Sequence, residues 1–185
     1  MDADQAASTA LQRCRLCCEP RVLRLSHFMP AAFYQHLGLD ETGTFQNKAL
    51  QKLTRSRLAR VPGQTKKHLL CGDCEELFNK NGEKWVSRFA HQVGRGFRLQ
   101  QALLRLGPRT TLSSGRIYYA DDDPEIDWSK LAYFALSVFW RGAVDSWTTV
   151  DDRAPKPFID IEADLRERLR GFLFGKENYP EGVLL

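Results

Sequence analysis

One stretch of the sequence decides the fold, Leu69-Leu-Cys71-Gly-Asp-Cys74-Glu75, in which two cysteines lie three positions apart. An earlier pair has the same spacing, Cys14-Arg-Leu-Cys17, and 53 residues separate the two pairs. Thiols stay reduced in the cytoplasm, so two C-x-x-C pairs favour tetrahedral Zn²⁺ over disulfides. We therefore predict one structural Zn²⁺ bound by these four cysteines; two unrelated pairs of buried cysteines are the alternative.

The residues around each pair predict different local structures. Positions 21–25 alternate polar and apolar residues, as in a half-buried strand. After Cys74, apolar residues recur at helical spacing as far as Val93. A zinc knuckle, a strand excursion and a C-x-x-C pair in the first turn of a helix together predict a treble-clef finger. Cys18 is either a spare thiol or an alternative ligand, and we favour the spare thiol.

Between the two cysteine pairs lies the motif Ser26-His27-Phe-Met-Pro30. Well after the second pair, a largely apolar segment covers residues 127–141. With the cysteine pairs, these motifs resemble the HNH-type zinc-finger proteins, small bacterial proteins with an HNH-like module at the N-terminus. The resemblance spans Cys14 to about Arg141. It implies a ββα-metal endonuclease core that hydrolyses phosphodiester bonds of DNA. In that core His27 activates water, and a divalent ion, Mg²⁺ or Mn²⁺, stabilises the leaving oxygen.

Other positions of the HNH pattern differ in this chain. An Asn usually precedes the second knuckle, where this chain has Gln64-Thr-Lys-Lys-His68, and Ser26 stands where an acid often precedes the histidine. Asn79 occupies the place of the last metal ligand on the helix. Glu75, Asn79 and Glu83 recur every four residues, so they share one helix face and are candidates for a second, hard-metal site. For the two glutamates, solvated surface charges are the alternative; for His27, it is packing at the end of a hairpin.

A basic stretch leads into the second cysteine pair. From Thr42 to Gly72 there is no acidic residue, and the seven basic ones are Lys48, Lys52, Arg55, Arg57, Arg60, Lys66 and Lys67. Such a stretch either contacts nucleic acid or is solvated. His68, beside Cys71, is a further candidate to ligate zinc or to contact phosphate, with an exposed loop histidine as the alternative. We predict that the partner is nucleic acid, with DNA first.

Composition limits the remaining possibilities. The 185 residues are 43% hydrophobic and 27% charged, which excludes a disordered chain. No apolar run is long enough to cross a membrane, and residues 1–5 carry no signal-like pattern, so we expect a cytoplasmic protein without a membrane partner. We predict an α+β, mainly helical chain, with an HNH-like zinc module over 10–92 and a helical part over 93–185 packed on it.

Periodicity and punctuation predict the other helices. One covers 48–60 and ends before Pro62-Gly63, another covers 97–106, and a third covers 161–174. The segment 128–144 is apolar nearly all round, so it belongs in the core, with Asp127 as its N-cap. Arg141 within it either pairs with a buried acid or extends to the surface.

Three functions compete on these observations. The first is a zinc-stabilised HNH-like endonuclease, and the second is a non-catalytic zinc module that binds nucleic acid or a partner protein. A redox protein using one C-x-x-C pair is remote, because the chain lacks the α/β pattern of thioredoxin-like chemistry.

Overall fold

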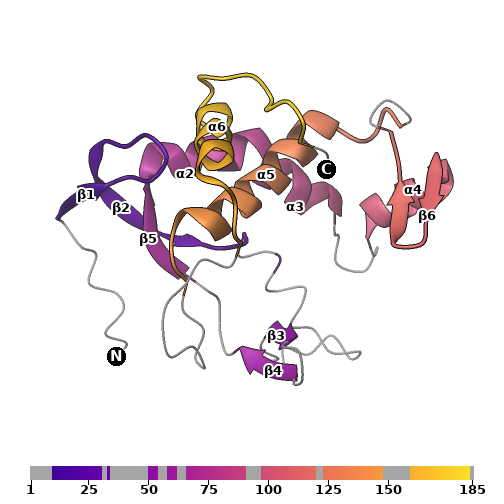
Figure 1. Ribbon diagram of the computed structural model, residues 1–185, viewed down its shortest axis with the longest axis horizontal. Helices are drawn as coiled ribbons and strands as arrows, with labels where there is room; N and C mark the ends of the chain where they lie inside the picture. Colours follow the sequence, from indigo (N-terminus) through magenta and orange to yellow (C-terminus); the bar gives the residue numbers. More distant parts are fainter. Residues whose placement is uncertain are drawn as a thin grey trace.

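A three-stranded antiparallel sheet in the order β1-β2-β5 carries the first cysteine pair and the first cysteine of the second. Its strands are β1 (Leu11–Arg13), β2 (Pro20–His27) and β5 (Lys66–Cys71). The structure is a computed structural model that describes residues 10–30, 33, 50–53, 58–61, 66–90, 97–119, 123–147 and 159–183. In Figure 1 the sheet lies at the left, beside the helices. The protein is α+β, as predicted.

A β-bulge brings the second cysteine pair into the interior. β2 pairs with β5 from Leu23↔Cys71 to His27↔Lys66, and the register shifts between Arg24 and Leu25, leaving Leu69 opposite no residue of β2. Successive strand residues normally face opposite sides, yet Leu69, Leu70 and Cys71 are all buried. The bulge therefore turns this end of β5 so that Cys71 enters the core.

One long helical run follows the strand directly. It consists of α2 (Gly72–Phe78), the π-helical segment η2 (Asn79–Glu83) and α3 (Lys84–Ala90), which continue end to end. The Asn81-Gly82 pair lies in η2 and does not end the run. A Cβ at Gly82 would lie 3.0 Å from both the backbone nitrogen and the Cβ of Phe134, so glycine permits this close approach of the next core helix.

The core helix is α5 (Trp128–Val144), and its bounds match the prediction. The side chain of Asp127 accepts a hydrogen bond from the backbone nitrogen of Lys130 at 3.1 Å, which confirms the predicted N-cap. The helix packs against η2 and against α6 (Ala163–Leu173). No helix among the described residues is both long enough and apolar enough to cross a membrane.

A single core joins the two halves of the chain. Leu16 and Leu69 from the sheet region pack in the same cluster as Phe78, Trp140 and Leu173 from α2, α5 and α6. The predicted boundary between 92 and 93 is thus crossed by the main core. A smaller cluster, built on Phe89, Ala102 and Ile126, connects α3 to α4 (Arg98–Leu106).

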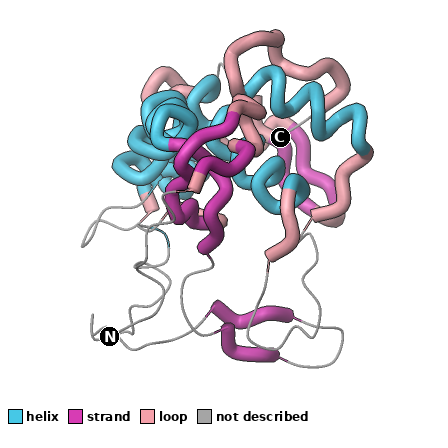
Figure 2. The backbone as a smooth tube through the Cα atoms, turned by 90° about the vertical axis from the view of Figure 1, so that its left-hand side faces the viewer, coloured by secondary structure: helices cyan, strands magenta, loops and turns pink. Residues whose placement is uncertain are grey.

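Two hairpins complete the described structure. One hairpin joins β6 (Thr110–Leu112) to β7 (Gly115–Ile117). The other joins β3 (Leu50–Leu53) to β4 (Leu58–Val61). This second hairpin lies at the bottom of Figures 1 and 2. The predicted helix over 48–60 is therefore wrong. In the hairpin Leu50 pairs with Val61 and Leu53 with Leu58, so apolar positions that suit a helix also suit two paired strands.

Candidate metal centre

The four predicted cysteines come together at one point. Cys14 follows β1, Cys17 lies in the turn before β2, Cys71 ends β5, and Cys74 lies in the first turn of α2. Their sulfur atoms all lie within 4.8 Å of one another, and Cys17 alone is only partly buried. Zn–S bonds of about 2.3 Å in a tetrahedron place sulfurs roughly 3.8 Å apart, so a small contraction closes this set around an ion. The donor set and its spacing fit a metal ion such as zinc.

Backbone hydrogen bonds shape the first pair as a knuckle. The nitrogen of Cys18 donates to the carbonyl of Cys14 at 2.9 Å, and the nitrogen of Cys14 donates to the carbonyl of Glu19 at 3.0 Å. The nitrogen of Cys71 donates to Sγ of Cys14 at 3.4 Å, which links the two pairs directly. Cys18 lies outside the cluster of four sulfurs, in agreement with its interpretation as a spare thiol.

The thiols perturb one another strongly. A hydrogen bond with the Cys74 thiol lowers the pKa of Cys14 to about 4, and the same contact, with burial, raises the pKa of Cys74. Four thiolates this close repel one another, so they do not all ionise without a cation. A divalent metal would remove that conflict, because it binds thiolates and releases their protons.

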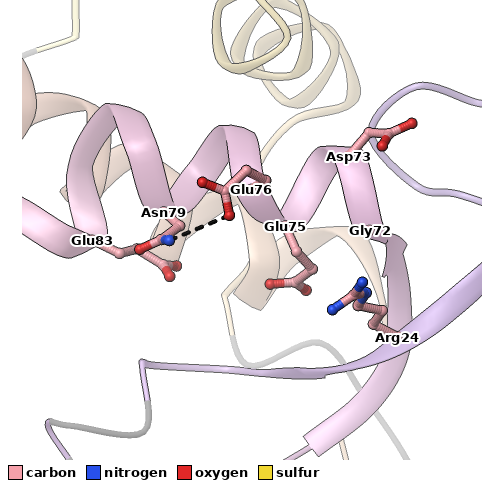
Figure 3. A pocket seen from close by; sticks show the side chains of 7 residues that line it. All are labelled: Arg24, Gly72, Asp73, Glu75, Glu76, Asn79 and Glu83. Carbon is pink, nitrogen blue, oxygen red and sulfur yellow. Dashed lines mark hydrogen bonds between the residues drawn. The ribbon is translucent and has the colours of Figure 1, made fainter.

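A pocket of about 530 Å³ lies along the same helical run (Figure 3). Its described lining brings together the predicted residues Glu75, Asn79 and Glu83, joined by Arg24 from β2. The other lining residues are Gly72, Asp73 and Glu76. The face of the helix predicted for a hard metal is therefore hollowed and rich in carboxylate oxygens, the donors that Mg²⁺ and Mn²⁺ prefer.

Glu75 reaches the sheet through a residue that the sequence analysis did not assign a role. The hydroxyl of Ser26, which is 2% exposed, donates to the Glu75 carboxylate and accepts from the backbone nitrogen of Leu70 at 3.2 Å. Burial raises the pKa of Glu75, and the hydrogen bond from Ser26 partly opposes that rise. The position of Ser26 directly before His27 was the only sequence signal for this role.

Glu83 forms an ion pair with Arg141 of α5, which is among the most deeply buried of the described residues at 1% exposure. The Arg141 guanidinium also lies over the ring of Phe78, 4.7 Å from its centre. Of the two alternatives for Arg141, the structure shows pairing with an acid. One carboxylate of the predicted hard-metal site is thus neutralised from within the protein.

His27 is the last residue of β2, pairs in register with Lys66, and is half-buried. It follows Ser26 directly but is not among the described residues that line the pocket. The structure therefore brings the residue before His27 to Glu75, while His27 itself stays outside the lining.

The structure describes only part of the basic stretch. Lys48, Arg55 and Arg57 lie outside the described residues, and Lys52 and Arg60 are described only as backbone in β3 and β4. Lys66 is exposed at the start of β5, and His68 is half-buried within that strand rather than in a loop.

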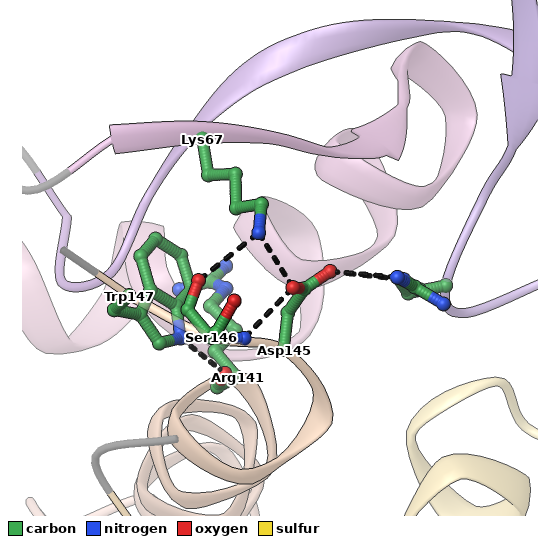
Figure 4. Close-up of polar contacts among 6 residues, drawn as sticks. Lys67, Arg141, Asp145, Ser146 and Trp147 are labelled. Carbon is green, nitrogen blue, oxygen red and sulfur yellow. Dashed lines mark hydrogen bonds and ion pairs between the residues drawn. The ribbon is translucent and has the colours of Figure 1, made fainter. Parts of the chain in front are cut away.

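Lys67 extends toward Asp145 and Ser146 at the end of α5, as Figure 4 shows. Its Nζ lies 2.6 Å from Oδ1 of Asp145 and donates to the carbonyl of Ser146 at 3.0 Å. Asp145 also pairs with Arg15 of the knuckle at 2.9 Å. Burial alone would raise the pKa of Asp145, but the hydrogen bond from Lys67 and the other contacts outweigh it and lower that pKa. This ion-pair cluster ties the sheet and the knuckle to the end of α5.

Comparison with protein-family models, with curated proteins and with solved structures finds no match for this chain. Its function is therefore argued from the cysteine cluster and the pocket beside it.

Proposed function

We propose that the knuckle, the antiparallel pair of strands β2 and β5, and the helix α2 form a zinc-bound treble clef of the HNH type. The order of these elements and the meeting of Cys14, Cys17, Cys71 and Cys74 support this proposal. Zinc here is structural, because four protein thiolates fill a tetrahedral shell and leave no position open to substrate.

We further propose that the chain is a metal-dependent endonuclease acting on DNA. One observation carries this proposal: Glu75, Asn79 and Glu83 line one pocket with Arg24, on the helix that starts at the zinc ligands and beside the strand that ends in His27. A divalent ion held by these oxygens would stabilise charge on the leaving oxygen. Arg24 suits a phosphate oxygen, and His27 suits proton removal from water.

Plasmid cleavage with Mg²⁺ or Mn²⁺ tests the proposal. His27→Ala should lower the rate by about 10²–10⁴-fold, while zinc content and melting temperature stay unchanged, because a general base contributes to rate and not to the zinc core. His68→Ala is the matched control; it should keep the wild-type rate at saturating DNA. A His27→Ala protein that cleaves at the wild-type rate contradicts this assignment.

A second candidate is a non-catalytic module that binds nucleic acid. The observation favouring it is that Glu83 already pairs with Arg141 and Glu75 already accepts from Ser26. In this case the wild-type protein binds DNA in a salt-dependent manner and cleaves none with any divalent ion.

A further inference from the structure

A second pocket, of about 280 Å³, lies between the knuckle and α6. It shares no described lining residue with the pocket lined by Glu75, Asn79 and Glu83. The charged residues that line that pocket are mainly acidic, whereas those that line this one are mainly basic. Four arginines contribute to its lining, Arg13 and Arg15 from the knuckle region and Arg166 and Arg170 from α6. We call these residues and the space between them the arginine cleft.

Among the described residues, only part of this positive charge is compensated. Arg15 pairs with Asp145, and Nε of Arg170 donates to Glu167 at 2.7 Å. Glu167 is the only acid in the described lining. Arg13 and Arg166 make no ion pair and no side-chain hydrogen bond with any described residue. The cleft therefore holds two guanidinium groups without an ion-pair or hydrogen-bond partner in the part of the chain described, although the charge of Arg166 also helps to lower the pKa of Glu167.

The lining also contains a buried donor that lacks an acceptor. Trp140 is 0% exposed, and its indole nitrogen has no hydrogen-bond partner among the described residues. The indole ring packs edge-on against Phe78, which fixes its position. Buried N–H groups are nearly always paired, but this nitrogen is shielded from solvent, so it reports changes in the cleft beside it and is not itself a contact for a ligand there.

We propose that the arginine cleft binds a phosphate group of the nucleic-acid backbone. This inference rests on the proposed nucleic-acid function and adds a second contact surface on the C-terminal helix. Guanidinium forks match phosphate oxygens two at a time, and all the cationic groups in the described lining are arginines rather than lysines. A site of this kind positions the duplex without reading its sequence.

The test is the salt dependence of DNA binding by the full, zinc-loaded chain, measured by fluorescence anisotropy of a labelled duplex. The double variant Arg13→Gln/Arg166→Gln should flatten the slope of log affinity against log salt by about 1, since loss of one phosphate contact removes about 0.9. The matched control is Arg116→Gln/Arg168→Gln, which removes equal charge from β7 and from α6 outside the cleft lining. It should leave the slope unchanged.

The NMR signal of the Trp140 indole N–H gives a second measurement, with Trp140→Phe to identify the peak. It should shift on addition of duplex DNA to wild-type protein and stay in place in the Arg13→Gln/Arg166→Gln variant. Inorganic phosphate should shift the same signal in the wild-type protein and leave it in place in the variant, because it offers the same oxygens to the cleft.

Each contrary outcome identifies what failed. An unchanged slope in the cleft variant, or equal flattening in the control, overturns the cleft proposal and leaves nucleic-acid binding intact. Zinc loss from the cleft variant without a change of slope overturns it too, because the arginines then only neutralise the dianionic zinc–thiolate group. If wild-type protein binds no nucleic acid, the proposed function fails. If free phosphate alone then shifts the indole signal, the cleft has a different phosphate ligand, and the backbone proposal is overturned.

Discussion

Cys18 has a left-handed backbone conformation, with φ of +64°, directly after the first cysteine pair. This conformation turns the chain after Cys18 so that the carbonyl of Glu19 accepts a hydrogen bond from the nitrogen of Cys14. For a residue with a Cβ, the left-handed region costs about 1–2 kcal/mol, whereas glycine adopts it freely. The knuckle is therefore slightly strained at this one position.

Substitution at Cys18 isolates that strain. Cys18→Gly should be more stable than Cys18→Ala by about 1 kcal/mol, because both remove the thiol and only glycine relieves the backbone. Urea denaturation of the zinc-loaded variants measures the difference. Zinc content should stay at the wild-type level in both; equal stability of the two variants contradicts the assignment of strain.

Asp145 makes the folded state sensitive to acid. Its pKa is lowered on folding, so the folded state favours the carboxylate, and the resulting stability is present above the ordinary value of 3.8 and lost as pH falls through the lower folded value. Asp145→Asn should reduce the free energy of unfolding by about 1–2 kcal/mol at pH 7, a range discounted because Lys67 and Arg15 are partly exposed.

Comparison of Asp145→Asn with wild type across pH checks this assignment. The difference in unfolding free energy should narrow as pH falls below 3.8, because the unfolded wild-type carboxylate is protonated first and the folded one only at a lower pH. A difference that stays constant over pH contradicts a charge-based role and indicates a packing effect.

At the scale of elements, the contact between α5 and η2 depends on a buried ion pair. Removal of one partner leaves the other charge buried and unpaired, at a cost of about 3–5 kcal/mol. Arg141→Leu should therefore destabilise the protein by that amount. The double variant Arg141→Leu/Glu83→Leu should recover much of the loss, since an apolar pair needs no charge compensation. A urea-denaturation double-mutant cycle measures the coupling; additive effects contradict the pairing.

Helices were predictable from the sequence where the local pattern of apolar and capping residues alone determines where they begin and end. The apolar run of α5 and its Asp127 cap gave the bounds of that helix, and α4 and α6 lie within or near their predicted ranges. β5 was not predicted, because its bulge buries three consecutive residues and hides the alternation of a strand. The β3–β4 hairpin was missed because pairing between strands, rather than local propensity, sets its register.

Within the site, cysteine spacing predicted the metal ligands because C-x-x-C already fixes the local geometry of each pair. The helical period of four likewise placed Glu75, Asn79 and Glu83 on one face. The pairing of Glu83 with Arg141 spans 58 positions, and no local pattern indicates which acid a buried arginine will meet. The contact of Ser26 with Glu75 spans 49 positions and was missed for the same reason.

At the scale of the whole molecule, the cysteine cluster and the helical core are one structure. Cys14, Cys71 and Cys74 belong to the same buried cluster as Trp140, Trp147 and Leu173. Structural zinc contributes about 10–16 kcal/mol of apparent binding energy, comparable with the total stability of a domain at about 5–15 kcal/mol. Loss of the metal should thus affect helices far along the chain.

Chelation of zinc should unfold α5 together with the knuckle. Helical circular dichroism and tryptophan fluorescence should change in a single transition as zinc is withdrawn, and added Zn²⁺ should reverse it. Mg²⁺ should have no such effect, because hard cations bind thiolates poorly. A metal-free protein that keeps its helical signal contradicts this coupling.

The closure of α6 over the knuckle has a consequence for synthesis of the chain. Nη1 of Arg170 donates to the carbonyl of Leu16 at 2.9 Å, and the two residues are 154 positions apart. At about 5–20 residues per second, a ribosome needs roughly 8–30 s to pass from one to the other. Until Cys71 and Cys74 are synthesised, Cys14 and Cys17 lack their partner thiols, and for the whole interval the knuckle lacks cover from α6. The nascent knuckle is therefore exposed to oxidation and to competing metals, and a chaperone or rapid zinc delivery would act in that interval.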